Sequence, residues 1–423
     1  MSILLKSATI LNPGSPHHKQ KLNIFISDAG LIKSIGKDTP KATKIVESRN
    51  LMVSMGWFDM RANFNDPGLE YKEDLESGLK TAASGGFTGV ALLPNTKPCI
   101  ESKNEVSYLK SKNSKSVTQI YPVGAVTKEC KGEDFTEILD MHASGAVAFS
   151  DGENPIWNTD ILLKTLQYLQ KFNGLLINKP EDKYLTAFGT MNEGITSTFL
   201  GLKGMPGLAE EIMIQRDIEL LKYAGGRIHF SNVSTAQAVK LIAGARKTGL
   251  KVTCDVAAHN LVFDDMLLSD YDTNYKVNPP LRDKKDIRAL EKSIAGSDID
   301  VIVSSHTPQD EESKRLEYDH AGFGMLGLQT FFPIMVQKLH GNDLSALLEK
   351  FTVNPREILN LPTPKIEEGE KADLTIFDPD LDWMYNAESN YSKSTNSPWL
   401  GQTLTGKVLG VVNNGRSFFN TFS

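Results

Sequence analysis

The 423-residue sequence lacks the features of several specialised classes of protein. It has only three cysteines, Cys99, Cys130 and Cys254, and their wide spacing shows neither a disulfide framework nor a CxxC zinc motif. No stretch approaches the roughly 18 consecutive apolar residues of a transmembrane helix. The N-terminus alternates apolar with polar residues and lacks the apolar core of a signal peptide. We therefore expect a soluble, cytoplasmic protein.

The sequence also has no excess of basic residues. Its formal net charge is −6, so neither nucleic acid nor an anionic membrane is expected as its main partner. Hydrophobic residues make up 40% and charged residues 23%, which is ordinary for a globular protein with a sizeable core. The length suits one large α/β barrel with a smaller second domain.

Both ends of the chain are rich in short β-type runs separated by turns. Residues 3–54 alternate such runs with turns at Pro13-Gly14 and Asp28–Gly30. Residues 372–420 return to this pattern, and Asn414-Gly415 is a strong hairpin signal. We predict one β-sandwich domain built from both termini, over residues 1–54 and 366–423.

The long middle section alternates buried strands with amphipathic helices. The predicted strands are Gly89–Leu93, Thr118–Tyr121, Ala146–Phe149, Gly174–Ile177, Arg227–Ser231, Lys251–Val256 and Ile299–Ser304. The predicted helices are Tyr71–Ser84, Asn158–Phe172, Ala209–Tyr223, Thr235–Thr248 and Lys285–Ala295. This repetition predicts a (β/α)8 TIM barrel over residues 55–365. A doubly wound open sheet is the alternative, although no GxGxxG or GxxxxGK[ST] motif follows a strand.

In such a barrel the reactive groups lie at the carboxyl ends of the strands. The polar residues at these positions are Asp59, Arg61, Asn63, Asn65, Asn95, Asp151, Lys179, Asn232, His259, Asn260, Ser305 and His306. This set contains few side chains that bind a metal ion well.

Several segments resemble dihydroorotases of the multifunctional-complex type, in the amidohydrolase superfamily. They begin with GWFDMRANFNDPGLEYKEDLESGLKTAASGGFTGVALLPNTKP at Gly56–Pro98 and continue with AVAFSDG at Ala146–Gly152 and HFSNVSTAQAVKLI at His229–Ile242. Later segments are NPPLR at Asn278–Arg282, FGMLGLQT at Phe323–Thr330 and NPREILNL at Asn354–Leu361. The matches run in order along nearly the whole chain, and the resemblance implies an amidohydrolase-type barrel.

The sequence departs from this family at the metal centre. Family members carry an Asp-x-His-x-His motif followed by an arginine, where this chain has Asp59-Met60-Arg61-Ala62-Asn63 followed by Asn65. The resemblance implies that the four metal-binding histidines are replaced by Arg61, Asn63, Lys179 and Asn232, and the catalytic aspartate by Ser305. Of the ligand set only Asp151, which resembles the bridging carboxylate, remains.

These replacements are poor zinc ligands. Arginine stays protonated in proteins and repels a cation, and asparagine offers only a neutral amide oxygen. We therefore expect no zinc and no other cofactor. Ring opening of a cyclic amide needs a metal-bound hydroxide, a Lewis acid and a base, so we expect impaired catalysis.

The remaining residues have functional and structural interpretations. For His259 and His306 we favour structural hydrogen bonding over catalysis. For Asp151 we favour an ion pair with Arg61 or Lys179 over metal binding. Asn95 and Asn278 resemble substrate contacts of the family but would equally suit loop capping.

The sequence leaves three functions open. The first is a catalytically inactive dihydroorotase-like protein of pyrimidine biosynthesis, acting as a structural or regulatory partner. By resemblance that partner is aspartate carbamoyltransferase, and a homodimer is implied. The second is an active dihydroorotase or related cyclic amidohydrolase. The third is a protein that binds a small anion through Arg61 and Lys179.

Overall fold

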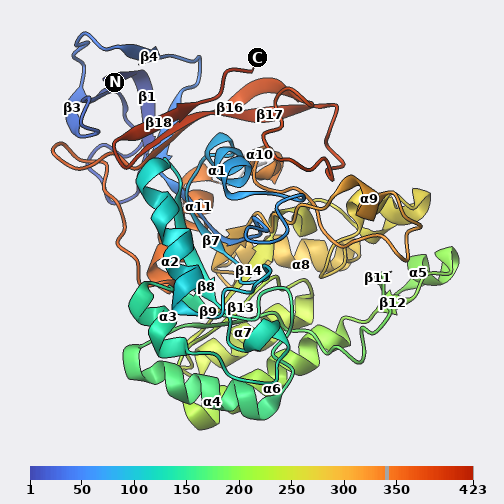
Figure 1. Cartoon of the computed structure of the whole chain (residues 1–423). Coiled ribbons are helices and arrows are strands. Elements are labelled where there is room, and N and C mark those ends of the chain that lie inside the picture. The colour runs from blue at the N-terminus through green and yellow to red at the C-terminus, as the bar shows by residue number, and fades with distance from the viewer. Residues whose placement is uncertain (339–342, 423) are drawn as a thin grey trace.

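The computed structural model describes residues 1–338 and 343–422. It has two parts, an α/β barrel formed by the middle of the chain and a sheet to which both termini contribute (Figure 1). None of the helices in the described residues is long and apolar enough to cross a membrane.

The barrel contains eight parallel strands that follow one another in chain order. They are β6 (Trp57–Ala62), β7 (Phe87–Leu92), β8 (Gln119–Gly124), β9 (Ala148–Phe149), β10 (Leu176–Asn178), β13 (Ile228–Phe230), β14 (Val252–Ala257) and β15 (Val301–Val303). A parallel bridge between Ala62 and His306 brings the last strand to the first. The predicted TIM barrel is therefore confirmed, and the open sheet is excluded.

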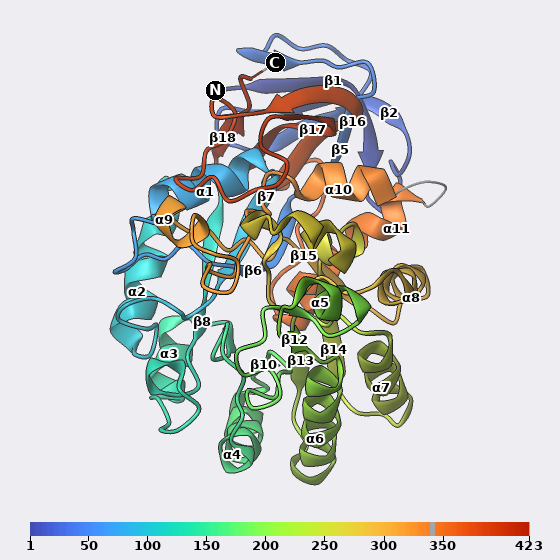
Figure 2. The same ribbon diagram turned by 90° about the vertical axis from the view of Figure 1, so that its right-hand side faces the viewer.

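Helices surround the barrel on its outside, as Figure 2 shows. They are α1 (Leu75–Ser84), α2 (Lys103–Ser111), α3 (Ile138–Ser144), α4 (Thr159–Leu169), α6 (Leu208–Ala224), α7 (Ala236–Lys247), α8 (Lys284–Ala295), α9 (Glu311–Lys314), α10 (Phe331–Lys338), α11 (Leu344–Glu349) and α12 (Val353–Ile358). Capping side chains mark where some of these helices begin. Asn158 caps α4 and Thr235 caps α7, each by accepting a hydrogen bond from a backbone N–H of the first turn.

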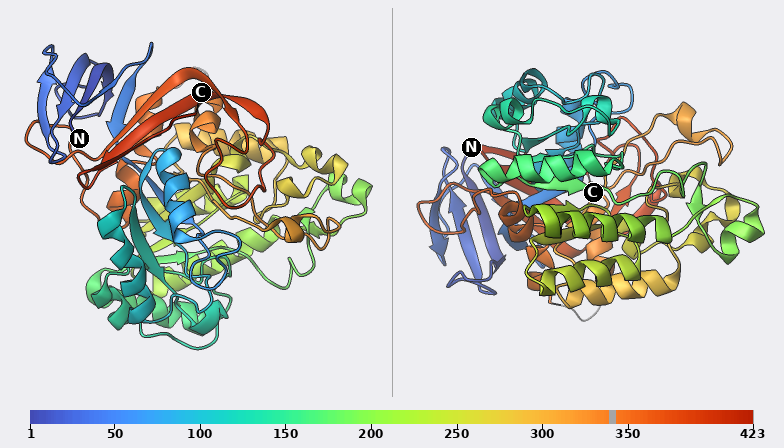
Figure 3. Two further views of the ribbon diagram at one scale, coloured as in Figure 1. Left: turned by 45° about the horizontal axis from the view of Figure 1, so that its top comes forward. Right: turned by 90° about the horizontal axis from the view of Figure 1, so that it is seen from below.

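Between β10 and α6 the chain forms an arm that projects from the barrel (Figures 1 and 3). It consists of β11 (Met191–Asn192), α5 (Ile195–Leu200) and β12 (Gly204–Met205), with β11 and β12 paired in parallel.

The strands from the two ends of the chain join in one continuous eight-stranded sheet. They are β1 (Ile3–Leu11), β2 (Lys21–Ile26), β3 (Ile32–Gly36), β4 (Lys44–Val46), β5 (Met52–Met55), β16 (Leu374–Tyr385), β17 (Gln402–Asn413) and β18 (Arg416–Phe419). Antiparallel pairing of β5 with β16 connects the two ends, so the terminal region that we predicted as a β-sandwich is present as a strand-rich region to which both ends contribute. The hairpin predicted at Asn414-Gly415 is confirmed, and both residues have positive φ, 53° and 67°.

Candidate functional site

The carboxyl ends of the barrel strands bring the predicted positions together. Arg61 lies in β6, and Asn63 follows it. Lys179 follows β10, Asn232 follows β13 and Ser305 follows β15. All five are buried, with 1% of Arg61, 2% of Asn232 and 4% of Lys179 exposed. The set predicted from the sequence therefore forms one polar centre inside the barrel.

Arg61 is paired with Glu153, a residue of the loop after β9. Its Nη2 lies 2.9 Å from Glu153 Oε2, and Asn63 Nδ2 donates to Glu153 Oε1 at 2.8 Å. Burial raises the pKa of Glu153, but the charges of Arg61 and Lys179 and these hydrogen bonds outweigh it, so the pKa is lowered overall. Arg61 Nη1 also donates to Ser231 Oγ at 3.3 Å.

The predicted ion pair of Asp151 with Arg61 or Lys179 is wrong. Asp151 accepts hydrogen bonds from the backbone N–H groups of Val126 and Thr127 at 3.0 and 2.9 Å, and from Thr127 Oγ1 at 2.5 Å. Burial raises its pKa to about 6 in spite of these bonds. Because these donors already surround its carboxylate, Asp151 stabilises the loop after β8. Glu153, and not Asp151, forms the ion pair with Arg61.

Lys179 has a carboxylate partner of its own. Its Nζ lies 2.8 Å from Glu181 Oε2 and donates to the backbone oxygen of Glu153 at 3.2 Å. Glu181 also accepts from Thr186 Oγ1 at 2.7 Å and from Asn278 Nδ2 at 3.0 Å. Burial raises the pKa of Glu181, yet Lys179 and these donors lower it overall. Each buried cation is thus balanced by one acidic residue.

Asn232 and Ser305 are linked to each other across the centre. Asn232 Nδ2 donates to Ser305 Oγ at 2.9 Å, and the backbone N–H of Asn232 donates to Asp255 Oδ1 at 2.6 Å. Both residues have positive φ, 55° and 49°, which for a residue other than glycine requires support from its surroundings. Asn232 Oδ1 has no partner among the described residues.

The two histidines of the site differ. His306 Nδ1 accepts a hydrogen bond from the backbone N–H of Gly327 at 3.2 Å, as its structural interpretation requires. Its Nε2 lies 3.5 Å from Glu73 Oε2 but has no hydrogen-bond partner among the described residues. His259 Nδ1, by contrast, has no hydrogen-bond partner in the described parts of the chain, so the bond expected there is absent. Burial alone lowers the pKa of His259 to about 4, and its imidazole is neutral at pH 7.

The asparagines of the site mostly hold loops. Asn95 donates to Asp151 O at 3.0 Å and accepts from the backbone N–H of Glu153 at 2.8 Å, which is the loop-capping interpretation. Asn278 is bound to Glu181 as described above. Asn65 has a φ of 56°, and its Nδ2 has no partner among residues 1–338 and 343–422. The side chain of Asn260 donates to Pro280 O at 3.3 Å.

The residues present do not fit a zinc ion. Two cationic side chains, Arg61 and Lys179, lie at the centre, at positions where the resemblance implies metal ligands, and neither is a group that binds zinc. Within residues 1–338 and 343–422 no group of three or more His, Cys, Asp or Glu side chains is arranged to hold a metal ion.

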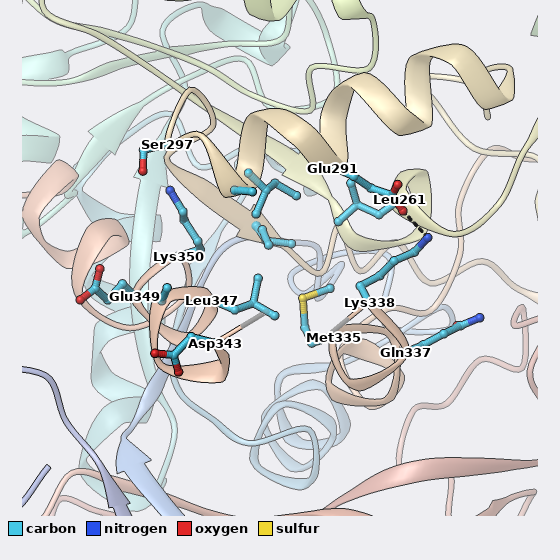
Figure 4. Close-up of a pocket in the computed structure, with 14 residues that line it drawn as sticks. Leu261, Glu291, Ser297, Met335, Gln337, Lys338, Asp343, Leu347, Glu349 and Lys350 are labelled. Atoms are coloured by element: carbon cyan, nitrogen blue, oxygen red, sulfur yellow. Dashed lines mark hydrogen bonds and ion pairs between the residues drawn. The ribbon is translucent and has the colours of Figure 1, made fainter. Parts of the chain in front are cut away.

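Space at the centre is small. A cavity of about 20 Å³, enough for about one water molecule, is lined by Glu153, His259, Asn278 and Ser305 together with the segment around Phe323. A larger cavity of about 460 Å³ lies elsewhere, between α8 and the segment of α10 and α11 (Figure 4). Apolar side chains such as Ile294 and Met335 line it, Glu291 pairs with Lys338 at its edge, and no predicted site residue contributes.

Sequence reasoning missed the two acidic partners, Glu153 and Glu181. A signal was present, because each lies two positions after a residue already assigned to the site, Asp151 and Lys179. In a loop that follows a strand, the side chain two positions after such a residue can point back over the end of the strand.

Comparison with known proteins places these observations in a family. Residues 50–238 match the model of dihydro-orotase-like proteins, and residues 209–417 match the amidohydrolase family model. The chain is 38% identical to a dihydroorotase of Pelotomaculum thermopropionicum over 98% of both chains. It is 36% identical to one of Geotalea daltonii over 98% of this chain and 99% of that protein. Among solved structures, L-hydantoinase (dihydropyrimidinase) from Arthrobacter aurescens superposes with a TM-score of 0.85 at 23% identity, covering 100% of this chain and 96% of that chain.

Proposed function

The chain belongs to the dihydroorotase family of amidohydrolases, and from this premise we propose that it serves pyrimidine biosynthesis as a catalytically impaired dihydroorotase-like protein. In this role it is a structural or regulatory partner, with aspartate carbamoyltransferase as the proposed binding protein and a homodimer as the proposed assembly. The observation that carries the proposal is the ion pair of the buried Arg61 with Glu153.

The chemistry of ring opening explains why this ion pair matters. Water attacks an unactivated cyclic amide slowly at pH 7, so the reaction needs an activated nucleophile, a group that polarises the carbonyl and a base. Glu153 is bound by Arg61 and Asn63, and Ser305 offers a hydroxyl group where the resemblance implies a carboxylate. His259 is a weak base, because its pKa is lowered to about 4.

An active dihydroorotase is the second candidate. It is supported by the identity of 36–38% to curated dihydroorotases over nearly the full length of both chains. On this alternative the enzyme would open a cyclic amide with a site assembled differently from the one described. Binding of a small anion is less well supported, since both cations are already paired with carboxylates.

Metal analysis and an activity assay on the full-length protein test the proposal. After dialysis, we expect well under one zinc per chain by mass spectrometry. We also expect less than about 1% of the dihydroorotate turnover of the Pelotomaculum thermopropionicum relative, a loss of at least about 2.7 kcal/mol in transition-state stabilisation. Stoichiometric zinc with comparable turnover would establish the second candidate instead.

The partner role needs a separate measurement. We expect the protein to elute together with aspartate carbamoyltransferase of the same cell in size-exclusion chromatography with light scattering. The same run gives the mass of the protein alone and so tests the homodimer. Independent elution of the two proteins at micromolar concentration would contradict this part of the proposal.

A further inference from the structure

Two of the three cysteines lie next to each other beside the barrel mouth. Cys99 is in the loop between β7 and α2, and Cys130 is in the loop between β8 and α3. Their Sγ atoms are 3.7 Å apart, although 31 positions separate the residues in sequence. Neighbouring parallel strands, β7 and β8, bring the two loops together (Figure 1).

The two thiols differ in accessibility. Cys99 is partly exposed, whereas only 1% of Cys130 is exposed. The hydrogen bond between the two thiols lowers the pKa of Cys99 and raises that of Cys130. Cys99 is therefore the thiol that a reagent in solution can reach, and Cys130 lies directly behind it.

The loop that carries Cys130 is held firmly. Glu129 and Cys130 both have positive φ, 53° and 54°, a conformation that L residues adopt rarely. The backbone N–H of Glu129 donates to Glu101 Oε2 at 2.6 Å, which joins this loop to the loop of Cys99. Asn154 Nδ2 donates to Cys130 O at 3.0 Å. These contacts keep the two sulfur atoms close in the reduced protein.

We propose that Cys99 and Cys130 form a reversible intramolecular disulfide in the presence of a small-molecule disulfide such as oxidised glutathione. The sulfur atoms have to approach from 3.7 Å to about 2 Å, a movement that rotation of the two cysteine side chains supplies. Cys254 is buried and donates to the backbone oxygen of Asp298, so it takes no part.

The reaction proceeds in two exchange steps. The Cys99 thiolate attacks one sulfur of oxidised glutathione, a mixed disulfide forms and one glutathione thiolate leaves. Cys130 then attacks Cys99 Sγ, its proton passes to the departing glutathione sulfur, and the second glutathione leaves as a thiol. Overall, two protein thiols are oxidised to one disulfide and one oxidised glutathione is reduced to two glutathione molecules.

The disulfide would act on the polar centre through the loop after β9. Asn154, which binds the backbone of Cys130, is adjacent to Glu153, the partner of Arg61. Thr127, at the start of the Cys130 loop, binds Asp151 in the same segment. Hydrogen bonds thus connect the Cys130 loop to the segment that carries Glu153 at two places.

Thiol titration of the full-length protein tests the proposal. After reduction, we expect three titratable thiols per denatured chain, and after incubation with oxidised glutathione we expect one. Peptide mapping should find Cys99 linked to Cys130, and dithiothreitol should restore all three thiols. Retention of three thiols, or linkage to Cys254, would overturn the proposal.

Single variants separate the two steps. In Cys130→Ser we expect Cys99 to stop at the mixed disulfide with glutathione, whereas Cys99→Ser should leave the buried Cys130 unmodified. Cys254→Ser is the matched control and should form the disulfide as the wild type does. If the wild type itself stops at the mixed disulfide on Cys99, the pair does not close and the proposal is wrong. These readouts do not depend on dihydroorotase activity and are independent of the proposed function.

Discussion

Arg61 carries a permanent charge with 1% of its side-chain surface exposed, so its energy depends on the carboxylate beside it. Glu153, with 30% of its side chain exposed, supplies that carboxylate, and Asn63 holds its second oxygen. Removing one partner leaves a buried charge without compensation, whereas removing both leaves a neutral centre. This asymmetry distinguishes a buried ion pair from a merely close contact.

A double-mutant cycle measures the coupling energy between Arg61 and Glu153. We expect Glu153→Gln to lower the free energy of unfolding by about 3 kcal/mol, because Arg61 then lacks its counter-charge. The double variant Arg61→Met with Glu153→Gln should recover most of this loss. Urea unfolding gives the values, with Glu219→Gln at the exposed pair with Lys222 as the control. Additive effects of Arg61→Met and Glu153→Gln, each also measured alone, would show that the pair is not coupled.

His259 gives a pH dependence whose sign can be worked out. Burial lowers its pKa from 6.5 to about 4, so below pH 6.5 the unfolded chain binds a proton that the folded chain does not. This contribution therefore destabilises the fold progressively as the pH falls from about 6.5 to 4, reaching about 3 kcal/mol.

We therefore expect His259→Asn to gain stability relative to the wild type as the pH falls through this window. Urea unfolding at intervals between pH 4 and pH 8 follows the difference, which should level off above pH 7. His320→Asn, which removes an exposed imidazole, is the matched control for the substitution itself. A difference that stays constant with pH would show that the pKa of His259 is the same in the folded and the unfolded chain.

The sequence predicts which residues lie at the site, but it does not predict which residues they bind. Strand ends placed Arg61, Lys179 and Asn232 correctly, because parallel strands of a barrel all point their carboxyl ends to one face. Which carboxylate meets which cation depends on loop geometry. The loop after β9 turns Asp151 toward the backbone of Thr127 and Glu153 toward Arg61. The spacing places Glu153 near the site, but it does not tell which of the two carboxylates faces Arg61.

Among the elements, the seven predicted middle strands match β7 to β10 and β13 to β15, because buried apolar runs are distinctive. The helices that were missed are short or atypical. Helix α2 is rich in charge and has two buried residues, although its capping box of Ser102 with Glu105 was a readable signal. Helix α10 is apolar on most of its surface because the terminal sheet covers it, a burial that only the tertiary structure reveals.

One side chain of the body, Arg282, binds both strands of the arm formed by β11, α5 and β12. Its Nη1 donates to Asn192 Oδ1 in β11 and to Met205 O in β12, both at 2.9 Å, and its Nε donates to Ser234 Oγ. Only 4% of Arg282 is exposed. The planar guanidinium thus joins both strands of the arm to the loop after β13.

We expect Arg282→Met to release the arm without unfolding the barrel. Hydrogen exchange of the amides of β11 and β12 should become at least about tenfold faster, equivalent to about 1.4 kcal/mol of local stability, while exchange in β7 stays unchanged. Arg282→Lys keeps the charge, but its single Nζ cannot occupy both the place of Nη1 in the arm and the place of Nε at Ser234, so it should resemble Arg282→Met in the arm. Equal acceleration in β7 would mean that Arg282 stabilises the whole fold and not the arm.

At the scale of the whole molecule, the barrel and the terminal sheet share an aromatic cluster around Trp57. The Trp57 ring packs against Phe332 of α10, Phe351 and Phe377 of β16, at centroid distances of 5.1, 5.3 and 5.4 Å. Its Nε1 donates to Ser54 Oγ at 2.9 Å, and its backbone N–H donates to the side chain of Thr375. One fully buried residue thus contacts both parts of the structure.

A shared core predicts that the two parts unfold together. We expect a single thermal transition for the wild type, and we expect Trp57→Ala to lower the free energy of unfolding by about 3–5 kcal/mol, since it leaves a cavity between the barrel and β16. Calorimetry and urea unfolding followed by circular dichroism measure both quantities. Phe199→Ala removes a ring that is 87% exposed and serves as the control. If Trp57→Ala shifts only one of two resolved transitions, the sheet and the barrel fold independently, and the contacts of Trp57 stabilise their docking without making them one cooperative unit.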